Sequence, residues 1–162
     1  MGLRCQQGRC FRQCGPAATA IKQCRTRNTL VVDAGDTIQA NSAELFLNDD
    51  LHPMIAAMNA IGYDIWTTGN HEYNYGMDVL KKVMGQQKAK VLTGNVYAPD
   101  GTPLADGYTI IKKGTVKIGV IGMVTPQHHP LGCQKIWRVG LSPTPWTRAA
   151  RSLIRSRIRW MF

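Results

Sequence analysis

With 162 residues, 44% hydrophobic content and a formal net charge of +10, the chain is long enough for one globular domain with a packed core. It has no run of about 20 apolar residues, and Arg4, Arg9 and Arg12 interrupt its start, so we expect neither a transmembrane helix nor a secretory signal peptide. As written, the product is expected to stay in the cytoplasm.

The charge is distributed unevenly along the chain. All ten acidic residues lie between Asp33 and Asp106, whereas 13 of the 20 basic residues and all five cysteines lie before Thr29 or after Gln127. Because two composition signals change at the same places, the ends and the middle were not shaped by one folding requirement. We expect an atypical Arg- and Cys-rich segment over 1–16, a partial domain over 17–127, and an atypical Arg-rich tail over 128–162 that is out of frame or disordered.

The first half of the chain predicts a helix, a strand, a helix and a strand. Residues 17–23 have helix-forming character, and the apolar run over 29–32 predicts a buried strand that ends at Asp33. Pro53 suits the first turn of a helix with apolar residues at helical spacing, and Gly62 suits its end. A second strand is predicted over 63–68, with Trp66 in the core.

The second half predicts a helix over 77–86, a third strand over 90–96, a turn at Pro99-Asp100-Gly101, and a hairpin of strands 108–112 and 115–124 around Lys113-Gly114. Alternation of strands and helices implies right-handed crossovers and a largely parallel sheet. The predicted fold class is therefore α/β, with mostly parallel strands and a hairpin on the C-terminal side.

Two strand ends carry residues suited to phosphoester chemistry. The loop Asp33-Ala34-Gly35-Asp36 follows the first strand, and Gly69-Asn70-His71-Glu72 follows the second. In parallel sheets such loops converge at the carboxyl edge. A carboxylate can bridge two divalent cations, an amide oxygen can complete a metal shell, and a histidine can reach a phosphate oxygen. Gly35 and Gly69 would let the backbone turn where a Cβ would crowd the ligands.

These motifs resemble a known family. Residues 32–39 (VDAGDTIQ), His52-Pro53, residues 69–76 (GNHEYNYG), residues 92–96 (LTGNV) and residues 119–126 (GVIGMVTP) are similar to the bacterial 5'-nucleotidase and 2',3'-cyclic-nucleotide 2'-phosphodiesterase branch of the calcineurin-like metallophosphoesterases. The resemblance covers roughly residues 17–127. It implies part of an α/β/β/α sandwich, which would be an incomplete N-terminal catalytic domain.

The resemblance also implies roles for individual residues. Asp36 would bridge two divalent ions, zinc, manganese or similar, and Asn70 would be a ligand of the second ion. His71 would stabilise the transition state or assist the leaving group, and Asn74 would orient His71. The substrate would be a nucleotide or cyclic nucleotide. Full-length relatives are periplasmic or associated with the cell wall.

Several of the family's metal ligands have no counterpart in this chain. An Asp-x-His before the first strand is missing, since no Asp or His precedes Asp33, and a later Gly-His-x-His is missing as well. The sequence therefore predicts a hydrolase fragment that binds its metals poorly and has little or no activity alone. Out-of-frame translation or a damaged gene around a genuine core is one explanation, and the neighbouring DNA would test it.

Other interpretations of the same residues remain open. Asp36 could form only an Asx turn, and the Gly69 motif could be an ordinary turn with a solvated histidine. His52 is expected to begin a helix rather than bind metal. His128 and His129 could replace missing ligands, and Cys5, Cys10, Cys14 and Cys24 could bind zinc, although their spacing lacks a Cys-x-x-Cys pair.

The alternative function is a non-enzymatic basic protein. Over 147–162, apolar residues and arginines fall on different faces of a predicted helix, a pattern typical of binding to nucleic acid or an anionic membrane. Such binding would weaken steeply with salt. The rest of the sequence indicates no specific nucleic-acid site, and the sequence does not specify an oligomeric state.

Overall fold

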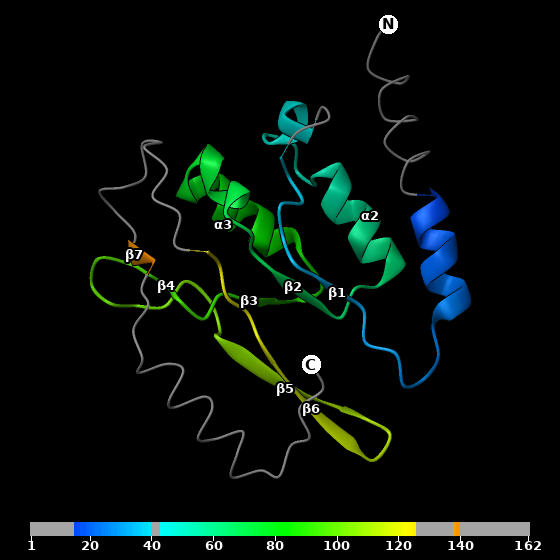
Figure 1. The fold of residues 1–162 in the computed structure, drawn as a ribbon. Coiled ribbons are helices and arrows are strands. Elements are labelled where there is room, and N and C mark those ends of the chain that lie inside the picture. The colour runs from blue at the N-terminus through cyan, green and yellow to red at the C-terminus, as the bar shows by residue number, and fades with distance from the viewer. Residues whose placement is uncertain (1–14, 40–42, 126–137, 140–162) are drawn as a thin grey trace, which may run out of the picture.

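In the computed structural model, residues 15–39, 43–125 and 138–139 are described (Figure 1). A helix spans 15–24, which confirms the predicted N-terminal helix. The elements that follow are β1 (Val32–Asp33), η1 (Ala43–Phe46), α2 (Pro53–Ile61), β2 (Ile65–Thr67), η2 (His71–Tyr75), α3 (Met77–Gln86), β3 (Lys90–Leu92), β4 (Val96–Tyr97), β5 (Tyr108–Lys113), β6 (Val116–Ile121) and β7 (Arg138–Val139).

Three parallel strands form the sheet that positions the candidate site. Their order is β1-β2-β3, with Val32 paired to Ile65 and Trp66 paired to Val91. Figure 1 shows α2 and α3 on one side of these strands and the β5–β6 hairpin on the other. The antiparallel hairpin and the parallel sheet confirm the predicted mixed α/β fold.

The core lies between the sheet and helices α2 and α3. Trp66 on the central strand is fully buried, as predicted, and packs in one cluster with Ile55 and Met58 of α2 and Leu80 and Val83 of α3. Both helices were predicted with their observed bounds. Burial of large aromatic and aliphatic side chains stabilises such a core by roughly 1.5 to 3 kcal/mol for each side chain.

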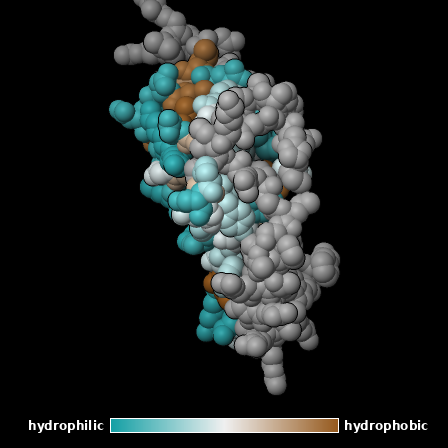
Figure 2. Space-filling view, turned by 90° about the vertical axis from the view of Figure 1, so that its left-hand side faces the viewer, coloured by the Kyte–Doolittle hydropathy of each residue, from teal (hydrophilic) through white to brown (hydrophobic). Residues whose placement is uncertain are grey.

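The described surface is mainly hydrophilic on the face that Figure 2 shows, with small, separate hydrophobic areas. Across the described residues, the exposed large hydrophobic side chains are Val32, Leu45, Leu51, Tyr108, Ile110 and Val116. None of the described helices has the length and apolar character that crossing a lipid bilayer requires.

The first strand is shorter and more exposed than the sequence predicts. β1 consists of two residues, and the side chain of Val32 is 44% exposed. The prediction of a buried strand is wrong because β1 is the edge of the three-stranded sheet and pairs only with β2 among the described strands. A continuous apolar run does not distinguish an edge strand from a central one.

The third strand also differs from its prediction as one element over 90–96. β3 ends at Leu92, and the backbone N–H of Gly94 donates to the carbonyl of Gly122 at 2.7 Å. A Cβ on Gly94 would lie 2.8 Å from that carbonyl oxygen and 3.1 Å from the carbonyl oxygen of Gly107. The strand therefore breaks where three glycines let separate backbone segments approach, a tertiary contact that local patterning does not encode.

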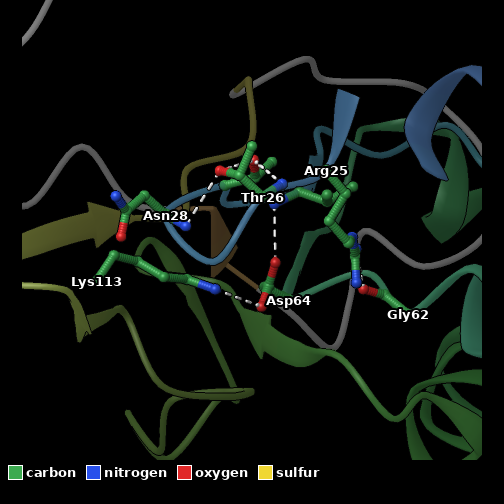
Figure 3. Close-up of polar contacts among 8 residues, drawn as sticks. Arg25, Thr26, Asn28, Gly62, Asp64 and Lys113 are labelled. Carbon is green, nitrogen blue, oxygen red and sulfur yellow. Dashed lines mark hydrogen bonds and ion pairs between the residues drawn. The ribbon is translucent and has the colours of Figure 1, made fainter. Parts of the chain in front are cut away.

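The hairpin is fastened to the sheet through Asp64, as Figure 3 shows. Asp64 Oδ2 accepts the N–H of Val31 at 2.8 Å, and Asp64 Oδ1 lies 3.3 Å from Lys113 Nζ at the end of β5. Nearby, Arg25 Nη2 donates to the carbonyl of Gly62 at 2.6 Å, at the end of α2. These contacts connect the hairpin, the segment before β1 and the N-terminal segment to residues 62–64, which directly precede β2.

His52 begins helix α2, as predicted. Its Nδ1 accepts the N–H of Met54 at 3.2 Å, and its Nε2 lies 3.1 Å from the carbonyl oxygen of Ala43. A neutral ring with its proton on Nε2 satisfies both contacts, whereas a protonated Nδ1 could not accept from Met54. The ring is 1% exposed, and this burial lowers the pKa of His52 below its ordinary value of 6.5, against smaller opposing effects of the Ala43 carbonyl and Asp49.

We expect the free energy of unfolding to decrease as the pH falls below 6.5, because His52 is then protonated in the unfolded chain while it stays neutral in the folded one. Well above pH 6.5 His52 is neutral in both the folded and the unfolded chain, and the free energy of unfolding no longer depends on its protonation. Urea unfolding at pH 7.5 and 5.5 measures the effect. His52→Asn, which keeps a capping side chain, should reduce the pH dependence; an unchanged difference between the two pH values would assign it to other groups.

Candidate functional site

Two loops meet at the carboxyl edge of the parallel sheet. β1 ends at Asp33 and β2 ends at Thr67, and their parallel pairing makes the chain leave both strands at the same edge. The first loop carries Asp36, and the second carries Asn70 and His71. This is the position at which parallel α/β folds place their functional loops.

The loop after β1 turns sharply at Gly35 and Asp36. Asp33 Oδ1 accepts both the N–H of Gly35 and the hydroxyl of Thr37, each at 2.9 Å, so the Asx turn is formed by Asp33. Gly35 has a φ of 96°, and Asp36, with a φ of 60°, is the one non-glycine residue with positive φ in the described ranges. Since such a conformation is uncommon for a residue with a Cβ, contacts from elsewhere must hold it.

Gly35 and Gly69 bring the two loops into direct backbone contact. A Cβ on Gly35 would lie 2.0 Å from the backbone nitrogen of Gly69, and a Cβ on Gly69 would lie 2.2 Å from Asp36 Oδ1. Both separations are far below a van der Waals contact. The close approach of the loops thus excludes a Cβ at either position, whereas the expectation that these glycines leave room for metal ligands stays a prediction.

The carboxylate of Asp36 contacts the second loop. The backbone N–H of His71 donates to Asp36 Oδ1 at 3.1 Å, and Asn70 lies between Gly69 and His71, immediately before η2. The residue Asp36 is exposed, whereas Asn70 and His71 are half-buried. The structure thus places these three sequence-predicted residues together at one edge of the sheet.

The side chain of Asn74 contacts the ring of His71. Its side-chain Nδ2 lies 3.0 Å from His71 Nδ1. Because an amide NH₂ group can only donate, it fixes Nδ1 as the acceptor and leaves the proton of a neutral ring on Nε2. The fourth sequence-predicted residue therefore lies beside His71, one turn further along η2.

Glu72 connects the two loops from the buried side, a role that the sequence did not reveal. Its side chain is fully buried, and its carboxylate accepts backbone N–H groups of Asp36, Thr37, Ile38 and Gly69. Burial raises the pKa of Glu72, and the donors from Asp36, Thr37 and Gly69 act against that increase. An acidic residue directly after Gly-Asn-His was the only signal available in the sequence.

Of the remaining candidates, the two that lie among the described residues do not join this site. His52 caps α2, and Cys24 is exposed with a free thiol. Cys5, Cys10, Cys14, His128 and His129 lie outside the described residues, as does the basic pattern over 147–162 on which the alternative function depends.

The donors present match only part of a dinuclear metal centre. Asp36 and Asn70 offer oxygen atoms, which suit hard or borderline divalent ions. However, the described part of the chain contains no group of three or more His, Cys, Asp or Glu residues arranged to hold a metal ion. Each divalent ion in such a centre needs about four to six donors. The described residues therefore do not by themselves fit a pair of ions.

Comparison with known proteins identifies relatives by sequence. The chain is 38% identical over 119 residues to the trifunctional nucleotide phosphoesterase protein YfkN of Bacillus subtilis, covering 62% of this chain and 8% of that protein. It is 36% identical over 129 residues to a 2',3'-cyclic-nucleotide 2'-phosphodiesterase/3'-nucleotidase of Haemophilus influenzae, covering 68% of this chain and 20% of that protein. A 5'-nucleotidase of Vibrio parahaemolyticus is 32% identical over 121 residues, which cover 65% of this chain and 22% of that protein. No family model matches the chain.

Solved structures show the same relationship in the fold. The calcineurin-like phosphoesterase YfkN from Bacillus subtilis superimposes with a TM-score of 0.75 at 29% identity, covering 87% of this chain and 49% of that one. The NAD nucleotidase of Haemophilus influenzae superimposes with a TM-score of 0.73 at 25% identity, covering 88% of this chain and 26% of that one. The chain thus spans a quarter or less of the three curated relatives and up to about half of these solved structures. Its relatives and structural neighbours, matched over part of their length, are calcineurin-like phosphoesterases that include 2',3'-cyclic-nucleotide phosphodiesterases and 5'-nucleotidases.

Proposed function

We propose that the chain carries part of the site of a metal-dependent phosphoester hydrolase that acts on nucleotides or 2',3'-cyclic nucleotides. The observation that supports this most directly is the 3.1 Å contact between the N–H of His71 and Asp36 Oδ1, which joins the two strand-end loops at one place. The relatives, whose names describe nucleotidases and cyclic-nucleotide phosphodiesterases, support the substrate class.

In this proposal His71 acts as a hydrogen-bond donor to the phosphoryl group. With Nδ1 accepting from Asn74, a neutral ring presents Nε2–H as a donor. Such a donor stabilises charge that develops on a phosphoryl oxygen and can pass a proton to the leaving oxygen. Asn74 is then a positioning residue, because it acts by fixing the tautomer and orientation of His71.

The proposed metal ligands are Asp36 and Asn70. The resemblance implies a pair of divalent ions, whose role when bound would be to activate a water molecule and offset phosphoryl charge. Since two ligands do not satisfy two ions, we propose that the chain alone binds them weakly and turns substrate over slowly or not at all.

Titration of the purified chain with Mn²⁺ or Zn²⁺, combined with assays on AMP and 2',3'-cyclic AMP, tests whether the chain alone binds metal weakly and lacks turnover. We expect no saturable binding of two ions below the millimolar range and turnover at the level of the uncatalysed control. Stoichiometric binding of two ions accompanied by turnover would refute the proposal that the ligand set is insufficient.

The site assignment has a separate test, because phosphate recognition does not require turnover. In NMR titrations we expect AMP, but not adenosine, to shift the signals of the His71 ring and the Gly69 amide, with a Kd in the millimolar range, about −4 kcal/mol. The buried ring of His52 provides an internal reference that should not move. Asn74→Ala should weaken the His71 response; AMP that leaves His71 unperturbed in the unmodified chain would rule out the assigned site.

A further inference from the structure

Glu72 is a buried titratable residue to which the proposed chemistry gives no role. Its side chain is fully buried, and both carboxylate oxygens are engaged by backbone donors. Oε2 accepts the N–H groups of Asp36 and Gly69, each at 2.7 Å. Oε1 accepts that of Thr37 at 2.5 Å and that of Ile38 at 3.4 Å. A carboxylate so occupied is not available to coordinate an ion or to move a proton.

The four donors come from both loops. Asp36, Thr37 and Ile38 follow β1, whereas Gly69 follows β2, so one side chain joins segments more than thirty residues apart in sequence. These N–H groups lie beyond the ends of the strands and therefore have no sheet partner. Buried backbone donors without acceptors are costly, and hydrogen bonds to a charged acceptor are stronger than neutral ones.

The contact between the loops is reciprocal. The loop after β1 gives the N–H of Asp36 to Glu72, while the second loop gives the N–H of His71 to the carboxylate of Asp36. Asp36 is also the residue with a φ of 60°, a conformation that needs outside support. Anchoring its N–H at 2.7 Å supplies that support and at the same time fixes where its own carboxylate lies.

We propose that Glu72 is the positioning residue of this site: its buried carboxylate holds the two loops together and thereby sets the position of Asp36 relative to His71. The effect on the site rests on the proposed function, whereas the connection between the loops does not. Glu72 touches neither substrate nor ion in this proposal, and it acts through the backbone of its neighbours.

Amide hydrogen exchange of the unmodified full chain, followed by NMR, tests the connection first. The amides of Asp36, Thr37 and Gly69 should exchange as slowly as amides inside α3, although they lie in loops. If they exchange as fast as exposed loop amides, the proposal is overturned without any variant. This measurement remains decisive even if a substitution at position 72 prevents folding.

Glu72→Gln and Glu72→Asp then test the role in the site. Glu72→Gln keeps the size of the side chain but replaces one acceptor oxygen with a donor. If the NH₂ group takes the place of Oε2, exchange at the amides of Asp36 and Gly69 should accelerate about tenfold or more; if it takes the place of Oε1, the amide of Thr37 should show this acceleration. Exchange inside α3 should change less than twofold. Glu72→Asp keeps the charge and should restore part of the protection. Glu44→Gln, the same change at an exposed residue of η1, should leave all these amides unaffected, because the side-chain oxygen of Gln can still accept the hydroxyl of Tyr75 that Glu44 accepts.

Binding of AMP separates this proposal from the proposed function. In Glu72→Gln we expect the affinity for AMP, read from the His71 ring, to decrease at least tenfold while the fold persists. Unchanged loop protection or unchanged AMP affinity in Glu72→Gln would overturn the positioning role. If the unmodified chain does not bind AMP, the proposed function fails, and the exchange rates still decide whether Glu72 joins the loops.

Discussion

Gly35→Ala is expected to lower the free energy of unfolding by about 3 kcal/mol or more and to disrupt the candidate site. The added Cβ would lie 2.0 Å from the backbone nitrogen of Gly69 and 2.6 Å from its Cα, so the second loop itself would have to move. The φ of 96° adds strain, because residues with a Cβ rarely adopt it. Urea denaturation measures the stability, and NMR shifts of the His71 ring report the displacement.

Two other glycines separate these causes. Gly101 has a φ of 87° with nothing within 4 Å of an added Cβ, so Gly101→Ala should cost only the backbone strain, roughly 1 to 2 kcal/mol. Gly85 lies in α3 with open space around it, and Gly85→Ala should stabilise the helix by roughly 0.5 to 1 kcal/mol. If Gly35→Ala lowers the free energy of unfolding no more than Gly101→Ala does, the clash between the two loops does not determine the cost of the substitution.

Trp66→Ala is expected to cost about 3 to 5 kcal/mol, because it empties the largest buried position of the core. The indole also links the core to the site. Trp66 Nε1 donates to Thr37 Oγ1 at 3.1 Å, and that hydroxyl donates to Asp33 Oδ1 at 2.9 Å. Trp66→Phe removes the N–H but keeps most of the apolar contact, so it should cost about 1 to 2 kcal/mol.

The loop after β1 should respond to Trp66→Phe more than the core does. Faster amide exchange at Gly35 and Thr37, with little change in α2, is the expected pattern in hydrogen exchange followed by NMR. Leu45→Ala serves as the control, since Leu45 is 65% exposed and truncation of its side chain should change stability by about 0.5 kcal/mol or less. Equal acceleration of exchange in the loop and in α2 would contradict a specific link through the indole.

The helices could be predicted from sequence because their signals are local. Pro53 at the first turn and Gly62 in the left-handed conformation define α2, and apolar spacing defines α3. The strands were harder to predict. Exposure of Val32 depends on which strands pair, and the break after Leu92 depends on glycines 94, 107 and 122 meeting in space.

The site could be predicted where residue type alone limits the structure. Glycine at positions 35 and 69 indicated crowded turns, and the structure shows the crowding. The contribution of Glu72 could not be predicted in the same way, because its partners are backbone N–H groups, which every residue except proline carries. Only the three-dimensional arrangement selects the four that it binds. The roles of Asp36, Asn70, His71 and Asn74 in catalysis stay predictions.

The contacts of Asp64 have a consequence for the order in which the protein folds. Its carboxylate joins Val31, 33 residues away, and Lys113, 49 residues away. The β5–β6 hairpin can form early, since its strands adjoin a short turn, but its docking must wait for closure of a long chain segment. We therefore expect docking of the hairpin to follow its own formation, and at the ribosome it cannot occur until residue 113 has emerged, well after α2 and α3 have been synthesised.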